Sequence, residues 1–149
     1  MMRINRRTDY AIRVMLALAK QPTGTRLPTH KIQELMLVPR SFLLRIIADL
    51  AKAGLIYTFA GPKGGVQLSR DPTAINLDHI WEAIEGPLLI SKCLEAPEGC
   101  PLNDGCPVND HWAKIQRMIL QALESTSLQG LAAEAYELAG SKPSHLTQQ

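Results

Sequence analysis

The hydrophobic period of the chain changes abruptly within residues 40–68, RSFLLRIIADLAKAGLIYTFAGPKGGVQL. The first part of this segment has apolar residues at the spacing of one helical face, and Gly54 follows as a natural helix stop. That face consists of Leu43, Ile46, Ile47 and Leu50. The second part has two β-prone runs, 55–59 and 66–68, on either side of a glycine-rich turn. The segment therefore predicts a helix followed directly by a β-hairpin.

Two more helices are expected before this segment. Thr8 is a plausible N-cap for a helix that runs to about Lys20, and Thr29 is a plausible N-cap for a shorter second helix. Pro39 suits the first turn of the third helix. Three helices, the last two closely spaced, followed by a hairpin describe a winged helix-turn-helix, which we expect over residues 1–72. The fold class is thus mainly α.

The charges of the chain are divided between its two halves. Residues 1–70 contain 12 Lys and Arg against 3 Asp and Glu, a net charge of +9, whereas residues 71–149 contain 4 against 11, a net charge of −7. Two solvated faces of opposite sign would explain this division, but its size favours a polyanion as the partner of the first half. We therefore expect the first half to bind double-stranded DNA.

The candidate DNA contacts lie on the third helix and around it. In a helix-turn-helix, the second helix of the pair enters the major groove and its N-terminal residues meet the base edges. The polar side of the third helix carries Arg40, Ser41 and Arg45, and the same unit supplies Arg6, Lys31 and the turn residue Lys63. The two arginines suit guanine edges or phosphates, and the sequence does not separate these roles. The alternative is an ordinary solvated helix face.

The second half is expected to contain a helical extension that dimerises. Its segments are a linking helix capped by Asn76 (73–91), a cysteine loop (92–108), dimerisation helices (109–140) and a flexible tail (141–149). Asn109 or Asp110 is the expected cap of the long helix, whose apolar stripe consists of Trp112, Ile115, Ile119 and Ala122. Such a stripe needs a partner, and we expect a second copy of the chain because DNA-binding dimers match two-fold operators.

All three cysteines, Cys93, Cys100 and Cys106, lie in one loop that is rich in Pro, Gly, Asn and Asp. A disulfide would leave the third thiol unpaired, and a structural zinc site usually has four ligands at shorter spacings. An iron–sulfur cluster fits best, because soft thiolates suit iron and a Gly/Pro loop lets the sulfurs converge. Three thiolates leave one coordination position for a weaker, exchangeable ligand of the kind that a sensor would use.

Other classes of function find no support in the sequence. There is no Ser–His–Asp arrangement, phosphate-binding loop or dinucleotide fingerprint, so we do not expect an enzyme. The glycines of GPKGG precede a strand, which is typical of a wing tip. No apolar run approaches the roughly 18 residues of a membrane span, and an odd cysteine count fits a reducing compartment. We therefore expect a cytoplasmic protein.

In the order of its motifs, the chain resembles the Rrf2 family of winged-helix transcription regulators, which includes IscR, NsrR and RirA. The resemblance rests on TDYAIRVMLALA, on LLRIIADLAKAGLIYTFAGPKGGVQLSRDPTAINLDHIWEAIEG and on the three-cysteine loop before a long helix. It implies a homodimer on a palindromic operator. It also implies that Cys93, Cys100 and Cys106 hold a cluster whose state switches DNA affinity. We favour a 4Fe–4S cluster, with a 2Fe–2S cluster as the alternative.

The fourth ligand distinguishes two groups within that family. IscR-like members have a His three residues after the last Cys, where this chain has Asn109, and His111 lies two residues further on. NsrR-like members, which the chain resembles most, use an Asp on the first helix of the other subunit, and that position is Asp9 here. A first-turn carboxylate that the helix dipole favours is the alternative explanation of Asp9.

The wing departs from the family pattern. Relatives usually carry an Arg before the first Gly of the wing, which they insert into the minor groove, whereas this chain has Ala60 before Gly61. Groove contact by that residue is therefore lost, and Lys63 supplies only a phosphate contact. Pro39 also replaces the usual Ser cap of the recognition helix.

Two classes of function follow from these observations. The favoured one is a DNA-binding repressor whose iron–sulfur cluster senses nitric oxide, iron or redox state. The alternatives are an iron–sulfur electron carrier that does not bind DNA, and a family member with a zinc-bound or empty loop that a protein partner regulates. The basic first half, which an electron carrier does not need, separates the carrier from the two candidates that bind DNA.

Overall fold

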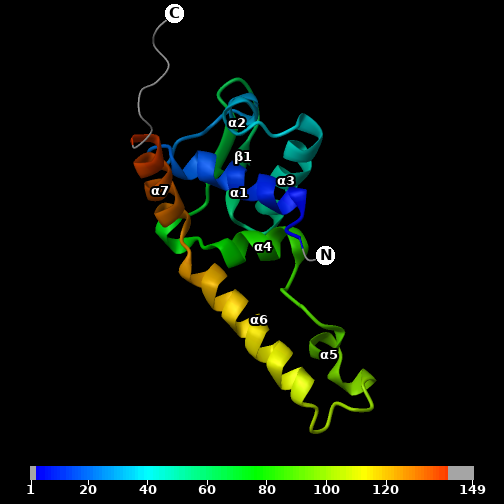
Figure 1. Cartoon of the computed structure of the whole chain (residues 1–149). Coiled ribbons are helices and arrows are strands. Elements are labelled where there is room, and N and C mark those ends of the chain that lie inside the picture. Colours follow the sequence, from blue (N-terminus) through cyan, green and yellow to red (C-terminus); the bar gives the residue numbers. More distant parts are fainter. Residues whose placement is uncertain (1–2, 141–149) are drawn as a thin grey trace, which may run out of the picture.

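The computed structural model (Figure 1) describes residues 3–140, so the tail expected at 141–149 lies outside the described residues. The elements in chain order are α1 (Arg6–Ala19), α2 (Thr29–Met36), α3 (Arg40–Lys52), β1 (Ile56–Phe59), β2 (Gly65–Leu68), η1 (Pro72–Ala74), α4 (Leu77–Glu85), α5 (Lys92–Glu95), η2 (Pro97–Gly99), α6 (Pro107–Ser125) and α7 (Leu128–Gly140). The mainly α winged helix-turn-helix that the sequence predicts is confirmed.

The core forms where the apolar faces of α1, α3 and α4 meet. The predicted stripe of α1 (Ala11, Val14, Met15 and Leu18) is buried, and so is that of α3 (Leu43, Ile46, Ile47 and Leu50). Ile80 of α4 is also fully buried, and α7 packs against α1 with Leu128 and Ala132. Helical periodicity therefore located the core correctly, because each stripe faces the same small interior.

The hairpin that forms the wing is antiparallel and pairs Phe59 with Gly65 next to the turn. Leu27 adds a bridge outside β2, exchanging two 2.9 Å backbone hydrogen bonds with Val66. A Cβ at Gly64 would lie 2.1 Å from the Phe59 carbonyl oxygen, and one at Gly65 would lie 2.7 Å from that of Leu27. The two glycines are therefore needed for close backbone approach on both sides of the wing.

Three predicted helix starts were wrong. Helix α1 begins at Arg6 because Asn5 caps it, accepting from Arg7 N at 3.1 Å, so that Thr8 lies inside the helix with its side chain buried. Helix α2 follows Pro28 at its N-cap position, and no side chain caps it.

Helix α6 begins at Pro107, ahead of Asn109 and Asp110, with Cys106 in the N-cap position. A proline has the backbone angle that the first helical residue needs and lacks an amide hydrogen, so it favours this earlier start. The side chain of Asn109 instead donates to Asn103 Oδ1 at 2.8 Å.

The predicted cap of α4 is confirmed. Asn76 Oδ1 accepts from His79 N at 3.0 Å, and His79 Nδ1 accepts from Asn76 N at 3.1 Å, so the two residues cap the helix reciprocally. Just before it, the side-chain and backbone hydrogen bonds from Thr73 to Asp71 hold the pKa of Asp71 below its usual value of 3.8. Both contacts fix the chain where it leaves the wing for the C-terminal helices.

The helix-turn-helix turn contains a strained position. Leu37, between α2 and α3, has left-handed backbone angles (φ 53°, ψ 43°) and is 79% exposed. For an L-residue other than glycine this conformation costs about 1–2 kcal/mol. The neighbouring Val38 is buried and anchors the turn, so packing holds Leu37 in place.

The chain leaves the core after α4 toward α5, and α6 runs from that far end back to the core, where α7 packs against α1 (Figure 1). Ile75 O accepts from Leu128 N at 2.7 Å at the return point, and Tyr136 donates to Lys20 O at 2.6 Å. Within residues 3–140, no helix combines the length and the hydropathy that crossing a membrane requires.

Candidate nucleic-acid interface and cysteine segment

The exposed side of α3 carries the predicted DNA contacts. Arg40, Ser41 and Arg45 are all exposed, while the opposite side of the helix is buried in the core. The turn at Val38 and Pro39 fixes the N-terminus of α3, the end that meets base edges in helix-turn-helix proteins. Burial of one side of α3 therefore forces its polar side outward.

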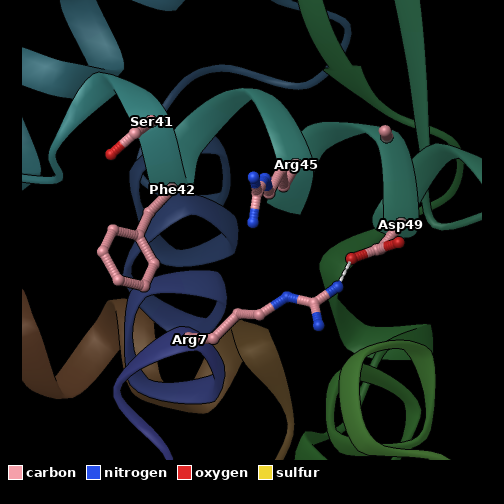
Figure 2. A pocket seen from close by; sticks show the side chains of 6 residues that line it. Arg7, Ser41, Phe42, Arg45 and Asp49 are labelled. Carbon is pink, nitrogen blue, oxygen red and sulfur yellow. Dashed lines mark hydrogen bonds and ion pairs between the residues drawn. The ribbon is translucent and has the colours of Figure 1, made fainter.

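A hollow of about 610 Å³ lies between this face and the start of α1. Figure 2 shows Ser41, Phe42, Arg45 and Asp49 of α3 around it, with Arg7 reaching across from α1 to pair with Asp49. The positive charge of Arg7 is therefore already paired within the chain. Arg45 lines the same hollow and, within residues 3–140, forms no ion pair.

The other predicted DNA contacts differ in whether an acidic side chain pairs with them. Lys31 pairs with Glu34 on the exposed side of α2, at 3.4 Å. Arg6 is exposed in the first turn of α1, and Lys63 is exposed in the wing turn. Neither of these two has an acidic partner in the described part of the chain. The free positive charge is thus distributed over α1, α3 and the wing.

Three consecutive residues of α1 make contacts in three directions. Arg7 pairs with Asp49 of α3, the fully buried Thr8 donates to Glu85 of α4, and Asp9 pairs with Arg13 at 2.9 Å. We call residues 7–9 the α1 junction. The first two partners lie 42 and 77 residues away in sequence, which is why local sequence patterns gave no sign of them. Any displacement of this turn must also move groups on α3 and α4.

The cysteine segment (92–108) consists of short turns. Cys93 lies in α5, Cys100 follows η2 and Cys106 precedes α6, and all three thiols are free and half-buried. Ser91 Oγ lies 2.9 Å from Cys93 Sγ. The backbone bonds of Cys100 and Cys106, to Pro97 O and Asn103 O, each span three residues. Because these hydrogen bonds join only near neighbours in sequence, the turns of the segment can move relative to one another and close around a bound group.

The donor set of this segment suits an iron–sulfur cluster, because three thiolates are the ligands such clusters use. The single chain does not assemble them: across residues 3–140, no three His, Cys, Asp or Glu side chains are grouped as a metal site. Asp9 is paired with Arg13, and His111 is exposed near the start of α6. Neither candidate fourth ligand therefore joins two of the cysteines in one group.

Helix α6 leaves an apolar surface uncovered. None of its residues is buried, and Val108, Trp112, Ile115 and Met118 are each at least 40% exposed. These four residues, together with Ile119 and Ala122, fall on one side of the helix at intervals of three and four. We call them the α6 stripe. A contiguous apolar face of this kind marks an interaction surface.

Comparison with known proteins finds relatives that match the winged helix, the cysteine segment and α6 together. Residues 4–134 match the model of a family described as "Rrf2: Iron-dependent Transcriptional regulator". The chain is 27% identical over 147 residues to the putative HTH-type transcriptional regulator Rv1287 of Mycobacterium tuberculosis, covering 99% of this chain and 88% of that protein. It is 26% identical over 138 residues to the HTH-type transcriptional regulator NsrR of Shouchella clausii, covering 92% and 93%.

A solved structure has the same fold. The structure of T. potens IscR superposes with a TM-score of 0.76 at 23% identity, covering 95% of this chain and 94% of that one. At this level of identity the similarity concerns the fold alone. The winged helix and the helical extension are thus both present in a known arrangement.

Proposed function

This chain belongs to the Rrf2 family of transcriptional regulators, and on that premise we propose that it is a homodimeric repressor whose cysteine segment holds an iron–sulfur cluster that controls operator binding. The winged helix makes it a DNA-binding protein, and its family argues against an electron carrier that does not bind DNA. The observation that carries the proposal is the outward polar face of α3 beside a wing.

On DNA, we assign α3 to the major groove, where Arg40, Ser41 and Arg45 contact bases and neighbouring phosphates. Arginine suits this role because its guanidinium donates two parallel hydrogen bonds to a guanine edge. Lys31, Lys63 and Arg6 surround α3 and contact the phosphate backbone. Contacts of this second kind fix the position of the protein on the duplex without selecting a sequence.

The α6 stripe is the proposed dimer interface. Its exposure in the single chain supports an interface there, and a two-fold dimer places one α3 in each half-site of a palindrome. Half-sites of this kind lie one helical turn apart, roughly 34 Å. Small changes in how the two copies are arranged therefore decide whether both helices engage.

Cys93, Cys100 and Cys106 are the proposed cluster ligands, with Asp9 of the partner subunit completing the set and His111 as the alternative. We favour a 4Fe–4S cluster over a 2Fe–2S cluster. When bound, the cluster supplies reactivity toward nitric oxide or sensitivity to iron supply and redox state. The lack of a preformed site in one chain agrees with a centre that needs a second chain for its completion.

The α1 junction provides the connection from the ligand to the DNA-binding helix. When Asp9 serves as a ligand, its carboxylate is withdrawn from Arg13, its partner in the single chain. Loss of the cluster would let Asp9 pair with Arg13 again and would shift the first turn of α1. Because Arg7 and Thr8 lie in that turn, Asp49 of α3 and Glu85 of α4 follow.

One observation favours a second candidate function. The three thiols do not converge in the single chain, which would also suit a family member that binds DNA with a zinc-filled or empty loop and responds to a protein partner. Iron and sulfide content separates this candidate from the first.

The switch predicts that DNA affinity depends on the cluster. The protein is purified without oxygen, and a duplex is selected with it from a randomised pool. Nitric oxide should then lower the affinity for that duplex by about tenfold or more, a coupling of the usual size between two sites. Mobility-shift titrations give the affinities. Equal affinities with and without nitric oxide would reject the switch, and a Cys100→Ser protein, which serves as the control, should not respond.

The ligand assignment predicts different effects for two substitutions. Asp9→Ala should lower the iron and sulfide bound per chain and alter the visible absorption of the anaerobic protein, because a ligand is lost. His111→Ala should leave both unchanged. Iron and acid-labile sulfide analysis of the two variants decides between them, and the opposite pattern would establish His111 as the ligand in place of Asp9.

The dimer interface predicts that a charge in the α6 stripe separates the subunits. Met118→Glu places a carboxylate among apolar side chains, so the sedimentation coefficient should fall to that of a monomer at micromolar concentration. Gln121→Glu introduces the same group at an exposed position outside the stripe and should leave the dimer intact. A Met118→Glu protein that remains dimeric would rule out this surface.

A further inference from the structure

The turn of the wing carries little charge of its own. Between β1 and β2 it contains Ala60, Gly61, Pro62, Lys63 and Gly64, so one lysine is its only cation. Figure 1 shows this turn at the end of the molecule where α2 lies, far from α5. A single flexible lysine suits a phosphate contact. To contact a base edge, the wing needs a hydrogen-bond donor that is held in a fixed orientation.

Arg26 supplies such a group from outside the wing. Its guanidinium carbon lies 3.6 Å from the ring centroid of Phe59, the last residue of β1 before the turn. The cation is therefore in contact with the face of the ring. Stacking of this kind orients the planar guanidinium and leaves the N–H groups on its edges available to a ligand.

The backbone that carries Arg26 is attached to the wing. The next residue, Leu27, exchanges two 2.9 Å hydrogen bonds with Val66 of β2. Gly65 permits this approach, because a side chain there would meet the Leu27 carbonyl at 2.7 Å. Arg26 is thus held to the wing by its main chain through Leu27 and by its side chain through Phe59.

Arg26 has no carboxylate partner in the described part of the chain. The residue is exposed, and none of the ion pairs in residues 3–140 involves it. Arg7, Arg13 and Lys31, by contrast, all have carboxylate partners. An ordered, exposed and unneutralised guanidinium beside the wing turn is suited to an anionic or acceptor-rich partner.

We propose that Arg26, presented on Phe59, is a DNA-contacting residue that enters the minor groove at the flank of each half-site. This inference rests on the proposed DNA-binding mode, in which α3 occupies the adjacent major groove. The minor groove of A·T pairs presents only acceptors at its floor, and where it is narrow its negative potential attracts arginine. Arg26 therefore supplies a preference for A·T pairs at positions that α3 does not contact.

The test uses two versions of a duplex selected by the wild-type protein from a randomised pool, with either A·T or G·C pairs in the flanks. Fluorescence anisotropy measures the affinity of each. The wild type should prefer A·T flanks, and Arg26→Ala should bind that duplex about tenfold more weakly and lose the preference. Arg26→Lys and Phe59→Leu should lie between these two. The first keeps a cation without the planar guanidinium, and the second keeps the guanidinium without the ring that orients it.

Arg70→Ala is the matched control, since it removes one exposed arginine just after β2, outside the wing turn. It should change the affinity by less than about twofold, as expected for a surface charge away from the contact. Thermal melting confirms that each variant is folded.

The outcomes are separable. A wild-type protein that binds no duplex would contradict the proposed DNA-binding mode itself. A wild-type protein that binds, with an Arg26→Ala variant of equal affinity, would overturn the role of Arg26 alone. An equal loss on both flanks would place Arg26 on phosphates and overturn the minor-groove assignment.

Discussion

The packing of α1 between α3 and α4 fixes the arrangement of the helices in the core. The apolar stripe of α1 is buried against both helices, so α1 cannot turn about its axis without exposing that stripe. Its first turn is fixed further by the contacts of Arg7 with Asp49 and of Thr8 with Glu85. The position of α3, and hence of its outward polar face, is therefore set from the end of α1.

The two features that one chain leaves incomplete lie at the other end of the molecule. The α6 stripe is uncovered, and the three thiols of the cysteine segment are not gathered. In the proposed dimer the second copy covers the stripe and supplies Asp9, and the cysteine segment closes around the cluster that it binds. Most hydrogen bonds of the cysteine segment span two to four residues. The longer ones join Asn109 to Asn103 and, at the start of the segment, Ile90 N to Gln116 Oε1, so rearrangement there disturbs little of the core.

Much of the fold was predictable because its signals are local. The apolar stripes of α1 and α3, the hairpin and the cap at Asn76 depend on residues within a few positions of one another. The helix starts were harder to predict. Helix α1 starts after the cap Asn5 and α6 starts at Pro107, and in both cases residues a few positions later are equally good caps by type. The contacts of Arg7 with Asp49 and of Arg26 with Phe59 join distant segments, and no periodicity marks them. The candidate DNA contacts were identified by charge, but charge alone did not show which cations were already paired.

The proposed switch requires the α1 junction to couple the cysteine segment to α3, and Asp49→Asn removes the charge through which Arg7 holds α3. The DNA dissociation constant is measured for cluster-loaded and for cluster-free protein, in the wild type and in this variant. We expect the ratio of the two constants, large in the wild type, to fall toward one in Asp49→Asn while its iron content stays the same. A variant that keeps the wild-type ratio would contradict the claim.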